Sequence, residues 1–224
     1  PLFLLILTAV IAAVDDYQDL LRLSVASAGN DHRLGGNEAP PAIISMYLGD
    51  EITDILDSIA ASRPAKGRAA TKMNLGAANV PAFMKDTADR NRTSPFAFTG
   101  NKFEFRMLGS TTNISCPNVM INTAVAEKLD EFATALSGSK NVEEDAKKLI
   151  RETYLAHRRI VFNGNGYSEE WTEEAKKRGL TDIDNTPDAL ERYTDEKNVA
   201  LLTKYGIYTP EEIAARKEIL LDNY

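Results

Sequence analysis

The sequence predicts an α+β fold in which helices dominate, above all in the second half, and a few strands lie in the middle. Apolar residues recur at helical spacing through much of the chain, and two short β-prone runs flank Gly100-Asn101. A composition of 43% hydrophobic and 26% charged residues is that of an ordinary globular chain. The 224 residues fit one large domain or two small ones, at roughly 100 to 200 residues per domain.

The apolar run Leu2–Val14 allows three interpretations. A transmembrane helix needs about 20 apolar residues, and Asp15 and Asp16 end this run too early. A signal peptide needs a basic start and a small-residue cleavage site, and neither is visible. We therefore expect a buried helix that continues into an amphipathic part. The apolar residues of that part recur at helical spacing: Tyr17, Leu20, Leu21 and Val25.

An irregular region is predicted next. Residues Ala28–Pro41 are rich in Gly, Asn and Pro and indicate a loop. The apolar run Ala42–Leu48 follows, and a helix is expected over Asp50–Ala61. Its inward residues would be Ile52, Ile55, Leu56 and Ile59. Residues 63–90 look like a long connection with at most a short strand near Lys72–Leu75. Such connections are uncommon in compact domains unless they are functional or covered by another part of the molecule.

The second half is predicted to be mostly helical. A helix is expected over Asn118–Leu136, and others over about 141–156, 168–178, 187–194 and 209–224. Thr209-Pro210-Glu211-Glu212 is a strong helix start, with Thr as N-cap and Glu at N3 of a capping box. No helix stop follows, and the chain begins without Met. We therefore expect a fragment of a longer protein.

Composition excludes several kinds of site. Cys116 is the only cysteine, so no disulfide can form within the chain, and only two histidines are present, which excludes a Cys/His zinc cluster. The net charge of 26 − 33 = −7 argues against a nucleic-acid binder. The charge is uneven, because nine basic and three acidic residues between Arg63 and Arg106 give that stretch +6. This basic island favours a local anionic ligand.

The run Lys102–Arg106 is informative as a strand. Side chains alternate between faces, so Phe103 and Phe105 share one face while Lys102, Glu104 and Arg106 share the other. One interpretation is a solvated sheet face with ordinary surface ion pairs. The other is a polar site in which Glu104 is an oxygen ligand for Mg²⁺ or Mn²⁺ and its basic neighbours bind phosphate or carboxylate.

Two further segments carry candidate residues. Arg90-Asn91-Arg92 places two guanidinium groups near hydroxyl side chains, a pattern that suits an anion but also a surface loop with distant acidic partners. In the loop, Asp31-His32-Arg33 and Glu38 lie among residues that suit a tight, mobile backbone. His32 alone is a weak signal, and Cys116 has no activating partner nearby in sequence.

Taken together, the loop SVASAGNDHRLGGNEAPPAI (Ser24–Ile43) and the segment DRNRTSPFAFTGNKFEFR (Asp89–Arg106) resemble glutamine synthetase, most closely its large type III bacterial form. The order of the motifs is that of the family. The resemblance covers nearly the whole chain and implies that residues 1–224 are an interior or C-terminal part of the catalytic domain. It implies the catalytic core that these enzymes share with guanidino kinases, with antiparallel strands flanked by helices.

The resemblance also implies roles for single residues. Glu38 resembles the flap glutamate that closes over the intermediate and helps to deprotonate ammonium. Arg33 resembles the arginine that contacts the γ-side of glutamate and the transferring phosphate. Arg92 resembles a catalytic arginine on the ATP phosphates, and Lys102 a basic nucleotide contact. Glu104 resembles a metal-ligand glutamate, and Arg106 resembles the arginine that binds the α-carboxylate of the substrate.

The implied activity is the ATP-dependent joining of ammonia to glutamate through γ-glutamyl phosphate, with Mg²⁺ or Mn²⁺. A cytoplasmic, ring-shaped homo-oligomer that binds neither nucleic acid nor membrane is implied as well. Two departures stand out: Ala97 replaces a further arginine of other forms, and Asp31-His32 replaces an aromatic-Lys pair. The family's N-terminal β-grasp domain and upstream metal-binding strands are not in this sequence, so we expect the piece alone to be inactive.

Two alternatives stay open. The first is a γ-glutamyl-amine ligase that uses a larger amine, since the motifs mark the acyl-phosphate chemistry better than the amine pocket. The second is a non-catalytic paralogue that serves assembly or regulation. The presence of all five acidic and basic motif residues together argues against the second: Arg33, Glu38, Arg92, Glu104 and Arg106.

Overall fold

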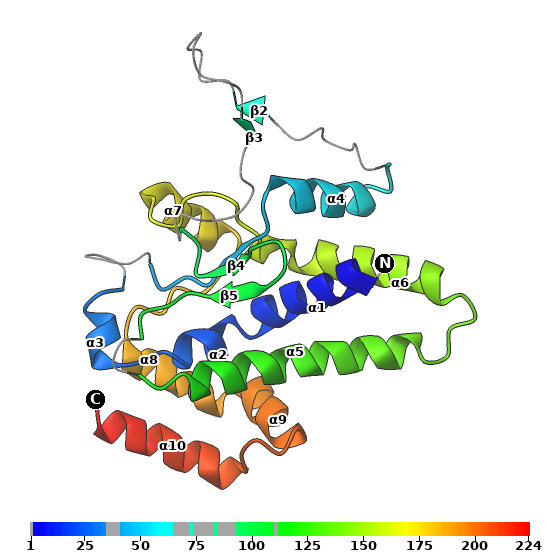
Figure 1. The fold of residues 1–224 in the computed structure, drawn as a ribbon. Coiled ribbons are helices and arrows are strands. Elements are labelled where there is room, and N and C mark those ends of the chain that lie inside the picture. The colour runs from blue at the N-terminus through cyan, green and yellow to red at the C-terminus, as the bar shows by residue number, and fades with distance from the viewer. Residues whose placement is uncertain (1, 35–40, 65–71, 74–82, 85–92, 110–111) are drawn as a thin grey trace.

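A computed structural model describes residues 2–34, 41–64, 72–73, 83–84, 93–109 and 112–224. It is helix-rich (Figure 1). Its main sheet is small and mixed, with three strands. The first helices are α1 (Leu2–Asp16), α2 (Gln18–Leu23), α3 (Ala28–Asp31) and α4 (Asp50–Ala60). The later ones are α5 (Ser115–Leu136), α6 (Val142–His157), α7 (Glu169–Lys177), α8 (Thr186–Glu191), α9 (Glu196–Lys204) and α10 (Pro210–Asp222).

Helix α1 is the buried centre of the fold. It packs between α5 and α6, and all its residues from Leu7 to Asp15 are buried. Around it lies one apolar cluster with the sheet, α6 and Trp171, whose indole stacks on Phe162 with ring centroids 3.8 Å apart. The prediction of a buried helix over Leu2–Val14 is therefore confirmed for Leu7–Val14, whereas Leu2, Phe3 and Ile6 in the first turns are exposed. In the part of the chain that the structure describes, no helix is long and apolar enough to cross a membrane.

The three-stranded sheet has the order β1-β4-β5, formed by β1 (Met46–Tyr47), β4 (Phe96–Phe98) and β5 (Phe103–Phe105). The two β-prone runs that flank Gly100-Asn101 are β4 and β5, which pair antiparallel, and Gly100 in the turn between them has a positive φ of 95°. Strand β1 is parallel to β4. The expectation of antiparallel strands alone is wrong at this edge, because a long crossover that includes α4 returns the chain in the same direction.

A second, two-stranded antiparallel sheet pairs β2 (Lys72–Met73) with β3 (Phe83–Met84). The short strand expected near Lys72–Leu75 is thus present. The prediction of at most one short strand between residues 63 and 90 is wrong, because β3 is a second one. The rest of that connection, residues 65–71, 74–82 and 85–90, lies outside the described residues.

The helical second half agrees with the periodicity, with one omission. The capping box of α10 is formed: the Thr209 hydroxyl accepts from the Glu212 amide at 3.2 Å, and the Glu212 carboxylate accepts from the Thr209 amide at 2.8 Å. Helix α9 was not predicted. A 3₁₀ turn (Arg192–Thr194) follows α8, and Asp195 alone separates that turn from α9. So short a separation contains no run of loop-forming residues that would predict a new helix. With α8 and α10, α9 packs against α2 and α5 in a second apolar cluster around Tyr193 and Leu202.

Candidate functional site

Strand β5 separates an apolar face from a charged face, as the alternation predicts. Phe103 and Phe105 lie 5.9 and 6.2 Å from the Phe96 ring, measured between centroids, and pack onto the core. Glu104 pairs in register with Ala97, and Ala97 pairs with Tyr47 of β1. Glu104, in the edge strand β5, therefore lies on the face of the sheet that points away from the core.

The three charged side chains of that face are in contact. Glu104 Oε1 lies 3.1 Å from Lys102 Nζ, and Glu104 Oε2 accepts from both Nε and Nη2 of Arg106 at 2.9 Å. The carboxylate is about one-third exposed and Arg106 is mostly covered, at 17% exposure of its side chain. The hydrogen bonds from Arg106, and then from Lys102, hold the pKa of Glu104 below its ordinary value. Glu104 is thus an ionised carboxylate that lies between two cations and remains partly accessible.

The backbone fixes this arrangement. The Arg106 amide donates to the Pro95 carbonyl at 2.7 Å, which extends the β4–β5 ladder by one bond beyond the strand. Ala97, where the resemblance leads us to expect an arginine, is fully buried in the central strand. A side chain as long as arginine at this position would have to displace its neighbours, so the departure fits the local packing.

Arg33 is held in a turn that follows α3. The helix begins with Ser27 as N-cap, and the amides of Arg33 and Leu34 both donate to the Asn30 carbonyl, at 3.0 and 2.8 Å. Arg33 is half-buried, whereas His32 is exposed. The predicted site residues Glu38 and Arg92 lie outside the described residues, so the described part brings together Lys102, Glu104 and Arg106.

A buried ion pair supports the same turn. Arg22 of α2 is fully buried, donates to the Ile183 carbonyl at 2.6 Å and to Asp31 Oδ1 at 3.0 Å. Asp31 also accepts from the Thr186 amide at 2.6 Å and the Thr186 hydroxyl at 2.8 Å. Burial lowers the pKa of Arg22, while Asp31 opposes that shift. Sequence reasoning missed this pair because Asp31 was considered only as a loop charge.

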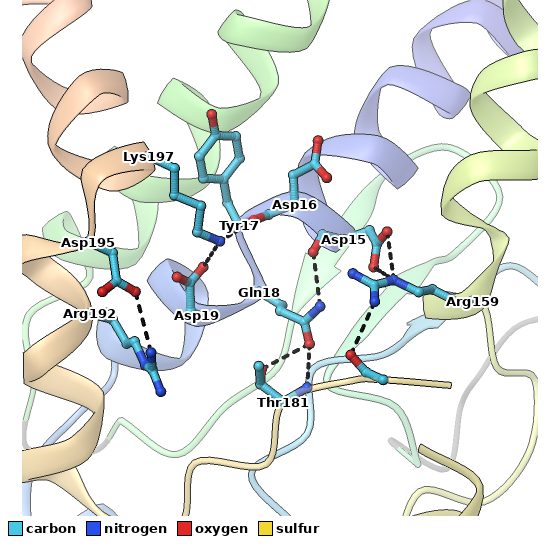
Figure 2. Close-up of a pocket in the computed structure, with 11 residues that line it drawn as sticks. Asp15, Asp16, Tyr17, Gln18, Asp19, Arg159, Thr181, Arg192, Asp195 and Lys197 are labelled. Carbon is cyan, nitrogen blue, oxygen red and sulfur yellow. Dashed lines mark hydrogen bonds and ion pairs between the residues drawn. The ribbon is translucent and has the colours of Figure 1, made fainter. Parts of the chain in front are cut away.

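A polar cleft of about 540 Å³ lies where α1 meets α2, facing residues 159–197. In Figure 2 its charged side chains point toward one another: Asp15 toward Arg159, Asp19 toward Lys197 and Arg192 toward Asp195. Gln18 joins the two walls, because its amide accepts from Thr181 at 2.9 Å and donates to the Asp15 carbonyl at 3.0 Å. The pairs Asp15–Arg159 and Asp19–Lys197 cross the cleft, whereas Arg192–Asp195 lies within one wall. Since these charges are already paired, their chemistry is that of an internal interface.

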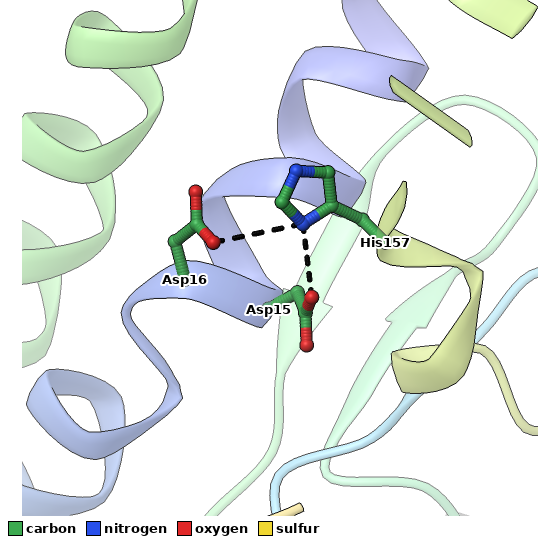
Figure 3. A group of neighbouring side chains, drawn as sticks. All are labelled: Asp15, Asp16 and His157. Carbon is green, nitrogen blue, oxygen red and sulfur yellow. Dashed lines mark hydrogen bonds and ion pairs between the residues drawn. The ribbon is translucent and has the colours of Figure 1, made fainter. Parts of the chain in front are cut away.

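Asp15, Asp16 and His157 form a group with the atoms of a metal site, shown in Figure 3. His157 Nδ1 lies 2.9 Å from Asp15 and 3.6 Å from Asp16. Both carboxylates already have a basic partner, however: Arg159 on Asp15 at 2.8 Å and Lys128 on Asp16 at 2.8 Å. A metal ion would have to compete with two cations, so we interpret the group as a tie between the end of α1 and its neighbours.

The comparisons with known proteins agree with the motifs. Residues 145–224 match the family described as the glutamine synthetase C-terminal domain. Type-3 glutamine synthetase of Dictyostelium discoideum is 47% identical over 99% of this chain and 31% of that protein. The glutamine synthetases of Butyrivibrio fibrisolvens and of Bacteroides fragilis (strain YCH46) are 48% and 44% identical, over 99% and 100% of this chain and 32% of each relative.

The chain thus spans about a third of the length of the curated relatives that it matches, while almost all of its own residues align with them. The resemblance read from the loop and strand motifs is confirmed by relatives that include a type-3 enzyme. On this evidence, almost the whole chain is similar to about a third of glutamine synthetase, and residues 145–224 match the C-terminal domain of that family.

Proposed function

We propose that this chain is part of the catalytic domain of an ATP-dependent glutamate–ammonia ligase, which makes glutamine through γ-glutamyl phosphate. The observation that supports this most is the charged face of β5, with Glu104 held between Lys102 and Arg106, in a chain whose relatives are named glutamine synthetases. The β-grasp domain, the upstream metal-binding strands and the guanidino-kinase-like core belong to the same proposal, as do a ring-shaped homo-oligomer and a cytoplasmic location.

Arginine is suited to both ends of glutamate. In the proposal, Arg106 binds the α-carboxylate, because a guanidinium group matches a carboxylate with two parallel hydrogen bonds. Its ion pair with Glu104 restricts the plane of the guanidinium before substrate arrives. Arg33 binds the γ-side and neutralises charge as the phosphoryl group is transferred, a reaction in which positioning and charge stabilisation do most of the work.

In the proposal, Glu104 is one ligand of a divalent metal, which would have to displace Lys102 or Arg106 from part of its carboxylate. Its carboxylate is ionised, about one-third exposed and offers hard oxygen atoms, which Mg²⁺ and Mn²⁺ prefer. When bound, the metal would neutralise phosphate charge. A single carboxylate does not make a metal site, so the remaining ligands would come from the rest of the longer protein. Lys102 and Arg92 would contact the nucleotide, whose phosphates carry the opposite charge.

The loop residue Glu38 completes the proposal as the flap carboxylate. A carboxylate that closes over γ-glutamyl phosphate excludes water from a species that hydrolyses readily. The same carboxylate can accept a proton from ammonium, which leaves neutral ammonia as the nucleophile.

The test uses the full-length protein that contains this chain. Product formation is measured with glutamate, ATP, Mg²⁺ and either ammonia or one of several primary amines. If glutamine forms far faster than the amide of any larger amine, the proposal is supported. Equal or faster use of a larger amine favours the γ-glutamyl-amine ligase. No turnover with any amine favours the non-catalytic paralogue. In the same protein, Glu104→Ala should weaken metal-dependent ATP binding, whereas Glu143→Ala on the exposed start of α6 should not.

A further inference from the structure

Asn30 is a buried polar residue between the two arginines proposed to bind substrate. The residue is only 4% exposed and lies in the short helix α3. A buried amide must have partners for its two N–H donors, or it costs about 1 to 3 kcal/mol. Both side-chain N–H donors of Asn30 have an acceptor.

The backbone of Asn30 holds the turn that carries Arg33. Its carbonyl accepts from the Arg33 amide at 3.0 Å and from the Leu34 amide at 2.8 Å. Its own amide is bound by the Ser27 carbonyl at 2.9 Å, so the residue is fixed from the N-terminal side as well. A displacement of Asn30 would therefore move the backbone of Arg33.

The side chain of Asn30 reaches to the other arginine. Asn30 Nδ2 donates to the Leu108 carbonyl at 2.9 Å, across 78 positions of sequence, and to the Val25 carbonyl at 2.5 Å. Leu108 lies two residues beyond Arg106. Arg106 is itself held by the hydrogen bond that its backbone amide donates to the Pro95 carbonyl. One residue thus connects the Arg33 turn to the end of the strand that carries Arg106.

We propose that Asn30 is a positioning residue, whose carbonyl holds Arg33 and whose side-chain amide holds the chain beyond Arg106, so that the two guanidinium groups keep the separation that glutamate requires. This inference rests on the proposed function of the two arginines. The connection does not include Lys102, whose ammonium group is exposed at the far end of β5. Loss of the connection should therefore weaken the binding of glutamate and leave that of ATP unchanged.

Two variants change the hydrogen-bond donors of Asn30 in different ways. Asn30→Asp is isosteric but replaces two N–H donors by oxygen, which faces the carbonyls of Val25 and Leu108. Asn30→Ser keeps one donor and avoids the added charge. The matched control is Asn198→Asp. Asn198 is fully buried, and its Nδ2 donates to Asp19 at 2.9 Å and to the Arg192 carbonyl at 2.8 Å, so these two bonds reach neither the Arg33 turn nor β5.

Steady-state kinetics of the full-length protein give the first readout. We expect KM for glutamate to rise about tenfold in Asn30→Asp, as for the loss of one net hydrogen bond, and less in Asn30→Ser. KM for ATP should stay within about twofold, and Asn198→Asp should leave both constants unchanged. An unchanged KM for glutamate in both Asn30 variants, or an equal rise in Asn198→Asp, would overturn the inference.

Hydrogen–deuterium exchange gives a readout that does not depend on activity. In both Asn30 variants the amides of Arg33 and Leu34 and those of residues 103–109 should exchange faster together, while Asn198→Asp should affect neither segment. Faster exchange in only one segment refutes the connection. If the wild-type protein forms no glutamine but the two segments still respond together, the connection stands and the proposed function of the two arginines fails.

Discussion

Removal of the charge on Asp31 should loosen the fold locally and strongly. Asp31→Asn keeps the shape but leaves the fully buried guanidinium of Arg22 without its counter-charge. It also replaces one of the two carboxylate oxygens by an NH2 group, and both oxygens accept hydrogen bonds: Oδ1 from Arg22 and the Thr186 hydroxyl, Oδ2 from the Thr186 amide. Breaking a buried pair by removing one partner costs about 3 to 5 kcal/mol, because the remaining charge stays desolvated.

Native-state hydrogen exchange of the full-length protein measures this cost. A loss of about 3 to 5 kcal/mol corresponds to roughly 100- to several-thousand-fold faster exchange through local opening. We expect this around Thr186–Glu191 and in the α2 residues near Arg22. The control is Glu143→Gln, which breaks an exposed pair with Lys147 at 2.8 Å and should change exchange only slightly. If Asp31→Asn changes protection no more than Glu143→Gln does, the buried pair is not the anchor that we infer.

Two predictions concern the proposed site. The carboxyl of Glu104 should titrate in an NMR experiment below the ordinary glutamate pKa of about 4.3, and Arg106→Met should raise that midpoint. Because the pKa of Glu104 is lower in the folded than in the unfolded chain, its ion pairs stabilise the fold above the unfolded pKa, and this stabilisation is lost as pH falls through the folded pKa. A Glu104 midpoint that Arg106→Met leaves unchanged would contradict the assigned cause of the shift. Glu38→Ala should leave KM for glutamate nearly constant and reduce kcat by about 100-fold or more, as for loss of an acid–base group; an unaffected kcat would remove the flap role.

The charged face of β5 was predictable because its signal is local. An alternation of two aromatic and three charged residues within Lys102–Arg106 determines both faces, whatever the rest of the fold does. The capping box at Thr209 is equally local. The direction of β1 was not predictable, because the parallel pairing of Met46 with Phe96 joins strands 50 positions apart through a crossover.

The sequence did not reveal Asn30 and Arg22 as residues that support the site, because each has a partner that lies far away in the chain. Asn30 looks like an ordinary loop residue until its amide is found on Leu108, 78 positions away. Arg22 lies between apolar residues of α2, and its partners Asp31 and Ile183 are distant in sequence or in another element. Short polar residues in a Gly- and Asn-rich segment carry no periodicity that would mark them as buried.

The central claim is that the longer protein transfers a phosphoryl group from ATP to the γ-carboxylate of glutamate before ammonia attacks. Transfer forms a bond between phosphorus and a γ-carboxylate oxygen, and attack by ammonia then releases phosphate that keeps this oxygen. The direct measurement is mass spectrometry of the phosphate made by the full-length protein from ATP, ammonia and glutamate labelled with ¹⁸O in the γ-carboxylate. The account predicts one ¹⁸O in each phosphate released; phosphate without the label, formed as ATP is consumed, would contradict it.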